Sequence, residues 1–289
     1  MQRHSTRFYC HLTHFQRNAS GGMGVVDLAL SKLGGAAFVV TMPSRQHCAW
    51  DFLANVLFIS PHRIIVIPAV NASMLTSTVL DGYIANGSFD EQYVKGSLAK
   101  NIFSGRKRSY ASFFSTTRAA TTLSHLRAHR AFLASSFKVA LFLEDDVGLS
   151  TRWDYTGGGV AEQRRLALSV LHDALLTAPI GWELLWLGYC FEQCRPQNQF
   201  VASNLSGLVF VRSLEPKCLH GYVATRSASK ALLKAILPLS SVLDADGSNH
   251  PSLAVLQPVR TETITPHFKP KQIPRSCTLP HPCASVHET

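Results

Sequence analysis

The sequence lacks a long hydrophobic run. No stretch approaches the roughly 18 consecutive apolar residues that a transmembrane helix needs, so we expect no transmembrane segment. Residues 1–20 are polar and include three histidines, and they therefore lack the apolar centre of a signal peptide. The compartment stays open: the ER or Golgi lumen if the protein is eukaryotic and this chain is truncated at its N-terminus, and otherwise the cytoplasm.

Cysteines and acidic residues are both scarce. Seven cysteines are scattered over 289 residues without a C-x2-C pair, which excludes a small disulfide-stapled scaffold. Cys190 and Cys194, with Cys218 further on, leave three interpretations open: free thiols, a disulfide, or part of a zinc site. The 18 Asp and Glu residues face 28 Lys and Arg residues, and the resulting net charge of +10 favours anionic partners. Because this surplus is dispersed apart from residues 106–108 (RKR), we expect no nucleic-acid partner.

Two further absences narrow the choice of fold. Residues 157–159 are three glycines, but no Lys-Ser/Thr pair follows them, so they do not form a phosphate-binding P-loop. No segment repeats with the period of a solenoid or propeller. The remaining composition, 46% apolar and 16% charged, is typical of a globular protein with a substantial core.

The most informative stretch is residues 137–147 (FKVALFLEDDV). An apolar run typical of a strand buried on both faces ends at Glu144, Asp145 and Asp146. Three adjacent carboxylates repel one another, and hard divalent ions such as Mg²⁺ or Mn²⁺ prefer oxygen ligands of this kind. In open α/β sheets, ligands bind at the carboxyl ends of the strands, where these acids would lie. The stretch therefore indicates either a metal site or an acidic surface turn.

The rest of the chain alternates between strand and helix patterns, which predicts a doubly wound α/β sheet. Strands are expected at residues 36–41, 63–70, 139–143, 182–187, 208–211 and 220–225, and helices at 50–58, 118–135, 167–178 and from 227 to Pro238. Residues 71–115 are expected to form loops and short helices. We divide the chain into an N-terminal extension (1–35), one domain (36–250) and a proline-rich irregular segment (251–289).

Several motifs, taken in order, resemble those of glycosyltransferase family 25, the group of lipooligosaccharide and procollagen galactosyltransferases. The match begins with the first strand and its turn (FVVTMPSR, 38–45) and the end of the second strand (IPAV, 67–70). It continues with a Ser-His helix (TLSH, 122–125), the acidic strand end (LEDDV, 143–147), WELLWLG (182–188) and HGYVATRSASKALL (220–233). The resemblance covers roughly residues 36 to 250, and the ordered set is more specific than any single motif.

This resemblance implies a GT-A-like, Rossmann-type fold: a mixed, mostly parallel sheet flanked by helices. It also implies an enzyme that transfers a sugar, commonly galactose, from a nucleotide diphosphate donor such as a UDP-sugar to a hydroxyl of a glycan or protein acceptor. A divalent cation, Mn²⁺ or Mg²⁺, that bridges the donor diphosphate to carboxylates would neutralise charge on the leaving group.

The resemblance and the strand geometry together suggest a role for eight residues. Glu144 and Asp146 should project to the same side of the strand and hold the metal, with Asp145 opposite. The donor is expected to contact Arg45, His125, Asp145 and His220. The general base that deprotonates the acceptor is expected to be Asp244 or Asp246.

The motifs also depart from the family pattern. Gln46 stands where a second arginine is usual, the Ser-His helix lacks a preceding Gly-Cys, and residues 241–244 (SVLD) match a Pro-Val-Asp motif only loosely. Two alternatives follow: an inactive relative that acts as a binding module, and a metal-dependent phosphohydrolase or nuclease. The phosphohydrolase is disfavoured because no further carboxylate cluster supplies a second metal site.

Overall fold

The computed structural model describes residues 24–95, 115–147, 160–178, 181–187, 200–202, 209–212, 220–238 and 261–265. Helices and strands alternate along most of this length, as the sequence predicts. The longer helices are α1 (Val25–Leu33), α2 (Gln46–Asp51) continued by the π-helical turn η2 (Phe52–Val56), α3 (Ser77–Ala85), α5 (Thr116–Ala134), α6 (Val160–Thr177) and α7 (Arg226–Ile236). Short 3-10 turns are η1 (Pro43–Arg45), η3 (Pro61–Arg63) and η4 (Ala72–Met74).

The strands form one mixed sheet. They are β1 (Gly35–Thr41), β2 (Ile64–Pro68), β3 (Val139–Glu144), β4 (Leu184–Trp186), β5 (Phe200–Ala202), β6 (Val209–Arg212), β7 (Gly221–Thr225) and β8 (Thr261–Thr265). Their order across the sheet is β2-β1-β3-β7-β4-β8-β6-β5. The pairings make β6 and β7 antiparallel to the strands beside them, while the others all run in one direction. The expected α/β fold with a mixed, mostly parallel sheet is therefore confirmed.

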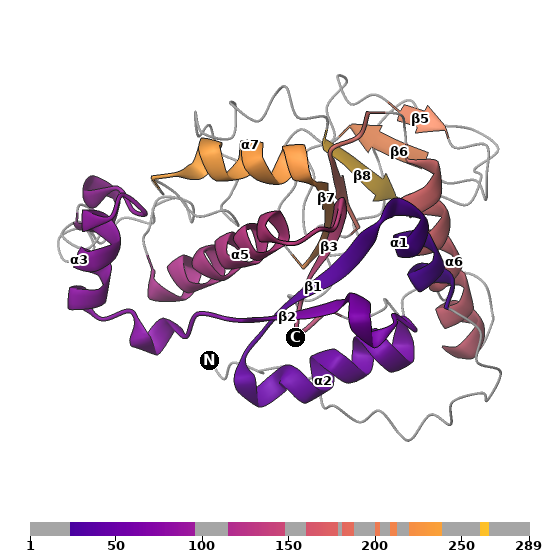
Figure 1. Ribbon diagram of the computed structural model, residues 1–289, viewed down its shortest axis with the longest axis horizontal. Coiled ribbons are helices and arrows are strands. Elements are labelled where there is room, and N and C mark those ends of the chain that lie inside the picture. The colour runs from indigo at the N-terminus through magenta and orange to yellow at the C-terminus, as the bar shows by residue number, and fades with distance from the viewer. Residues whose placement is uncertain are drawn as a thin grey trace, which may run out of the picture.

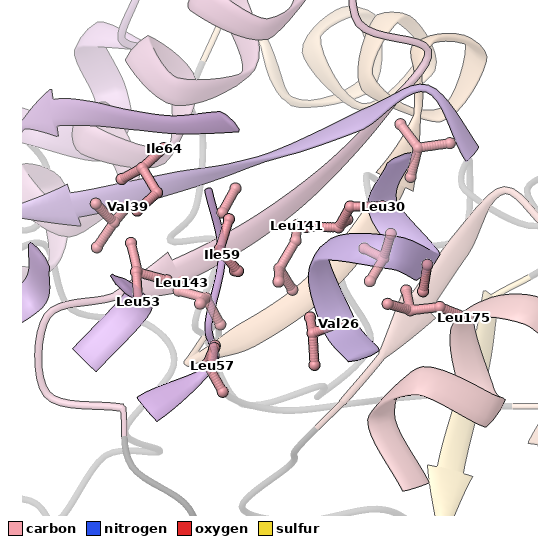
Figure 2. Close-up of a cluster of buried hydrophobic side chains, with 14 of the residues drawn as sticks. Val26, Leu30, Val39, Leu53, Leu57, Ile59, Ile64, Leu141, Leu143 and Leu175 are labelled. Carbon is pink, nitrogen blue, oxygen red and sulfur yellow. The ribbon is translucent and has the colours of Figure 1, made fainter. Parts of the chain in front are cut away.

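Helices cover both faces of the sheet (Figure 1): α5 and α7 lie together on one side, and α1 and α6 on the other. The side of α1 and α6 holds an aliphatic core (Figure 2), in which Leu141 of β3 lies near Leu30 of α1, and Leu143 lies near Leu53 and Leu57. Leu175 of α6 belongs to the same cluster. Alternation along the strands sends their other residues to the opposite face.

The opposite face has an aromatic core. Phe38 of β1 and Phe142 of β3 have ring centroids 5.6 Å apart, and Phe132 of α5 packs edge-on against both at 5.5 and 5.9 Å. All three side chains are fully buried. These contacts hold the C-terminal part of α5 against this face of the sheet.

The C-terminal end of α5 is capped by an arginine at the start of α7, the neighbouring helix on the same side of the sheet. The Arg226 guanidinium donates hydrogen bonds to four backbone carbonyls, those of Phe132, Leu133, Ser135 and Phe137, at 2.6–3.2 Å. The last carbonyls of a helix have no hydrogen-bond partners within the helix, so the Arg226 side chain supplies donors to carbonyls that would otherwise be unpaired. The cap also ties the start of α7 to the end of α5.

Helix α1 corrects the expected boundary at residue 35. Val26, Ala29 and Leu30 are fully buried against the sheet, so residues 25–35 belong to the domain and not to an extension. Asp27 on the same helix is also buried and accepts a hydrogen bond from the Ser60 backbone N–H (3.0 Å), with the Arg63 guanidinium 3.6 Å away. The helix was missed because it is only nine residues long and lies between glycines.

Strand β8 corrects the other boundary. It lies in the segment that was expected to be irregular, yet it pairs with β4 on one side and β6 on the other. The domain therefore includes residues 261–265. None of the helices in the described ranges has both the length and the hydropathy that a membrane span requires.

Candidate functional site

Three segments meet at the edge of the sheet where β3 ends. Strands β1 and β3 run parallel, so Thr41 and Glu144 reach the same edge. Strand β7 runs antiparallel to β3, and Leu143 pairs with Gly221, so the start of β7 lies beside the end of β3. The Glu144 backbone N–H donates to the His220 carbonyl at 3.1 Å, which brings these two side chains together.

The side chains of Glu144, Asp146 and His220 form a cluster whose ligand atoms all lie within 4.8 Å of one another. Glu144 is 19% exposed, whereas Asp146 and His220 are about half exposed at 47% and 48%. Two carboxylates and an imidazole form a donor set able to hold a divalent cation. The imidazole favours Mn²⁺ over Mg²⁺, because Mg²⁺ prefers oxygen ligands throughout. We call these three residues the acidic-histidine cluster.

Glu144 is held at both of its oxygens by histidines. Its Oε1 lies 3.0 Å from His125 Nε2, and its Oε2 lies 2.8 Å from His220 Nδ1. Burial alone would raise the pKa of Glu144, but the hydrogen bonds and charges of the two histidines outweigh burial and lower the pKa to about 2. Glu144 is therefore a carboxylate of fixed orientation at neutral pH.

Asp145 points to the opposite side of the strand end, as alternation predicts, and braces the turn after β1. Its carboxylate accepts hydrogen bonds from the Thr41 hydroxyl and the Met42 backbone N–H, both at 3.0 Å. Arg45, which is 55% exposed, adds a bond of 2.8 Å from Nη1. Asp145 therefore sets the position of Arg45, the residue expected to contact the donor.

A line of buried polar side chains continues behind Glu144. His125 Nδ1 lies 3.0 Å from the Tyr222 hydroxyl, which lies 2.9 Å from His129 Nε2; His129 Nδ1 in turn lies 2.9 Å from the Ser229 hydroxyl. Burial lowers the pKa of His129 to about 3, with a further contribution from the charge of His125. Burial also raises the pKa of Tyr222 well above its usual value, and the Glu144 charge adds to this.

The structure thus brings six of the expected residues to one edge of the sheet. Glu144, Asp146 and His220 form the acidic-histidine cluster, and Arg45 pairs with Asp145. His125 is fully buried and reaches the cluster through Glu144, with both ring nitrogens hydrogen-bonded. Asp244 and Asp246 lie outside the described residues.

Sequence reasoning missed two residues of this region, His129 and Tyr222. The signal for His129 is its spacing: it follows His125 by four residues on one helix, which places both imidazoles on the same face. Tyr222 was noted only within the HGY motif. Its hydroxyl contacts both histidines, and no pattern in a single sequence indicates that α5 packs across β7.

Comparison with known proteins adds no relative. Neither a scan against protein-family models nor a search of curated proteins finds a match to this chain. The resemblance to glycosyltransferase family 25 therefore depends on the ordered motifs and on what their residues can do at this edge of the sheet.

Proposed function

We propose that this protein is a metal-assisted glycosyltransferase that moves a sugar, commonly galactose in the family it resembles, from a nucleotide diphosphate donor to a hydroxyl of a glycan or protein. The observation that carries the proposal is the acidic-histidine cluster at the carboxyl end of β3. Ligands of open α/β sheets bind at this edge, and a sugar nucleotide presents two adjoining phosphates that a divalent cation can bridge to carboxylates.

Glu144, Asp146 and His220 would hold the cation. Mn²⁺ suits their donor atoms, and when bound it would neutralise charge that develops on the leaving diphosphate. Asp146 and His220, the two half-exposed members, would face the ligand, while Glu144 keeps a fixed negative charge behind them. The cluster therefore has two ligands that a cation and its donor can reach and a third, Glu144, whose orientation is fixed.

Arg45 supports the anionic end of the donor. A guanidinium has five N–H donors, and the bond to Asp145 uses one nitrogen. The side chain is more than half exposed, so its remaining donors suit a phosphate oxygen or the nucleotide. Asp145 holds this cation at the end of β1, and loss of Asp145 would leave Arg45 without that anchor.

The acceptor side of the reaction is assigned to Asp244 or Asp246. One of these carboxylates would take the proton from the attacking hydroxyl as the new glycosidic bond forms and the bond to the diphosphate breaks. The test for the pair is donor hydrolysis compared with transfer in Asp244→Asn and Asp246→Asn. The base variant should lose transfer to an acceptor while donor binding is kept.

The decisive experiment needs no acceptor, because water can replace the acceptor hydroxyl. Binding and hydrolysis of a panel of nucleotide sugars are measured with and without Mn²⁺ for the wild type, for Asp146→Ala and for the control Asp81→Ala, which removes an exposed carboxylate from α3. Metal-dependent hydrolysis of one donor should fall about 10- to 100-fold or more in Asp146→Ala and stay unchanged in the control.

The other possible outcomes separate the alternatives. Donor binding without turnover indicates an inactive relative that acts as a binding module. Phosphate release or nucleic-acid cleavage without a sugar donor indicates a phosphohydrolase or nuclease. If no donor binds and Asp146→Ala behaves like the wild type, the metal-site interpretation of the cluster is wrong.

A further inference from the structure

A continuous chain of hydrogen bonds connects helix α7 to the acidic-histidine cluster. It runs from Ser229 through His129, Tyr222 and His125 to Glu144, with heavy-atom distances of 2.9, 2.9, 3.0 and 3.0 Å. The first four side chains are at most 1% exposed. Because water does not reach them, each polar atom of these side chains depends on the others for its hydrogen bond. We call these five residues the buried relay.

The charge on Glu144 determines which atom of His125 donates to it. An ionised carboxylate has no proton, so His125 Nε2 must donate to it, and if the ring carries no second hydrogen, Nδ1 accepts. In that case the Tyr222 hydroxyl donates to His125 and accepts from His129 Nε2. His129 Nδ1 is left to accept from the Ser229 hydroxyl. Each hydrogen has one acceptor, and the whole chain donates toward the cluster.

The relay has one other complete proton order. If His125 carries hydrogen on both nitrogens, its Nδ1 donates to the Tyr222 oxygen, the phenol donates to His129 Nε2, and His129 Nδ1 donates to the Ser229 hydroxyl. Both orders place a hydrogen on His125 Nε2. Without that hydrogen the ionised Glu144 oxygen would lose its buried partner, and leaving a buried polar group unpaired costs on the order of 1–3 kcal/mol.

Aromatic rings prevent the relay from relaxing into another geometry. Phe142 lies 5.1 Å from Tyr222 and 4.3 Å from His129 between ring centroids, and Trp186 lies 5.3 Å from Tyr222. These rings are buried and close-packed, so the imidazoles and the phenol have little freedom to turn. The ring planes, and with them the hydrogen-bond directions, are fixed by packing.

From this geometry we propose that His125 is a positioning residue for Glu144, and that Tyr222, His129 and Ser229 serve the site by holding the His125 ring so that a hydrogen on Nε2 points at the carboxylate. The N–H aimed at Oε1 holds the carboxylate plane so that Oε2 faces His220 and the exposed side of the cluster. The consequence for cation binding rests on the proposed function, whereas the hydrogen on Nε2 and the orientation do not.

The first measurement requires neither a metal ion nor a sugar donor. Histidines are labelled with ¹⁵N, and the tautomers of His125 and His129 are determined by NMR at neutral pH, with signals assigned by substituting each histidine in turn. In the wild type His125 should carry a hydrogen on Nε2, and His129 should hold a single hydrogen. Tyr222→Phe removes the oxygen that bonds both rings, so the signals of both rings should change.

The second readout is Mn²⁺ affinity, measured by electron paramagnetic resonance for the same proteins. Substituting outer residues that orient a metal ligand typically lowers metal affinity 10- to 100-fold, and we expect about tenfold for Tyr222→Phe. Ser124→Ala is the matched control: Ser124 is buried on the same helix but bonds the Ala120 carbonyl and the Val70 N–H, outside the relay. Its Mn²⁺ affinity should equal that of the wild type.

The outcomes are distinguishable. A wild-type His125 without hydrogen on Nε2 overturns the inference, as does a Tyr222→Phe protein whose histidine signals match the wild type. An equal loss of Mn²⁺ affinity in Ser124→Ala would show that only general destabilisation is at work, which also overturns it. If the wild type binds no Mn²⁺, the proposed function loses its metal site, and the histidine signals alone decide the inference. If Tyr222→Phe does not fold, Ser229→Ala replaces it, with the same changes expected at His129.

Discussion

The stability of this protein should fall steeply in mild acid, and His129 is the main cause. In the unfolded chain a histidine has a pKa near its ordinary value of 6.5, whereas burial in the fold lowers the pKa of His129 to about 3. As the pH falls below 6.5, the unfolded state takes up a proton that the folded state does not. The contribution of neutral His129 is therefore fully present above pH 6.5 and is lost progressively between pH 6.5 and 3.

The size of the effect follows from the width of this window. One proton bound by the unfolded state alone lowers the free energy of unfolding by about 1.4 kcal/mol per pH unit. Between pH 6.5 and about pH 5 the loss is therefore roughly 2 kcal/mol, a large part of a stability of ~5–15 kcal/mol. Glu144 acts in a lower window: its lowered pKa adds stability above pH 4.5, which is lost as the pH falls toward 2.

Urea denaturation followed by circular dichroism, at several pH values between about 7.5 and 5, measures this slope. His129→Gln removes the titrating group. Its free energy of unfolding should be lower than that of the wild type at every pH, but its slope against pH should be smaller by about 1.4 kcal/mol per pH unit. His62→Gln is the control, because His62 is exposed and its removal should leave the slope as in the wild type. A wild-type curve that is flat over this range, or an equal slope in His129→Gln, would refute the reasoning.

Two further predictions concern single side chains. Arg226→Met should remove the cap on the last carbonyls of α5 and lower the free energy of unfolding, measured by urea denaturation, by roughly 2–3 kcal/mol. Lys230 is exposed on the same helix α7, so Lys230→Met should change this free energy by less than about 0.5 kcal/mol, and equal effects of the two variants would contradict the capping role. Asp145→Ala should release the turn after β1 and lower the free energy of unfolding by roughly 2 kcal/mol. It should also weaken nucleotide binding measured by calorimetry, because Arg45 loses its anchor, and a nucleotide affinity equal to that of the control Asp81→Ala would contradict this.

The strands and helices of the central fold were predictable because their hydrophobic patterns are strong. The run 139–143 followed by acids predicts β3 and the place where it ends, and alternation predicts that Glu144 and Asp146 share a side. Helix α1 and strand β8 were not predictable in this way. α1 has only nine residues, and β8 carries Thr and Glu within a proline-rich segment, so tertiary pairing rather than local pattern decides its conformation.

The site divides in the same manner. The run of three adjacent acids makes the carboxylates of the site predictable, and the motif resemblance predicts a role for His125 and His220. The antiparallel register that places His220 beside Glu144 depends on how β7 enters the sheet, which no local pattern encodes. The same is true of Tyr222, whose hydroxyl links two histidines nearly 100 positions away in the chain only because α5 crosses the sheet at that point.

The position of β8 has a consequence for biosynthesis. Among the described strands it comes last in the sequence, yet it lies inside the sheet between β4 and β6. Until residues 261–265 have been made, β4 lacks this neighbour and presents unpaired N–H and C=O groups, the kind of edge that captures strands of other chains. The sheet closes only once residues 261–265 are available. We therefore expect ribosome-bound chains, and truncations before residue 261, to be the forms that depend most on chaperones.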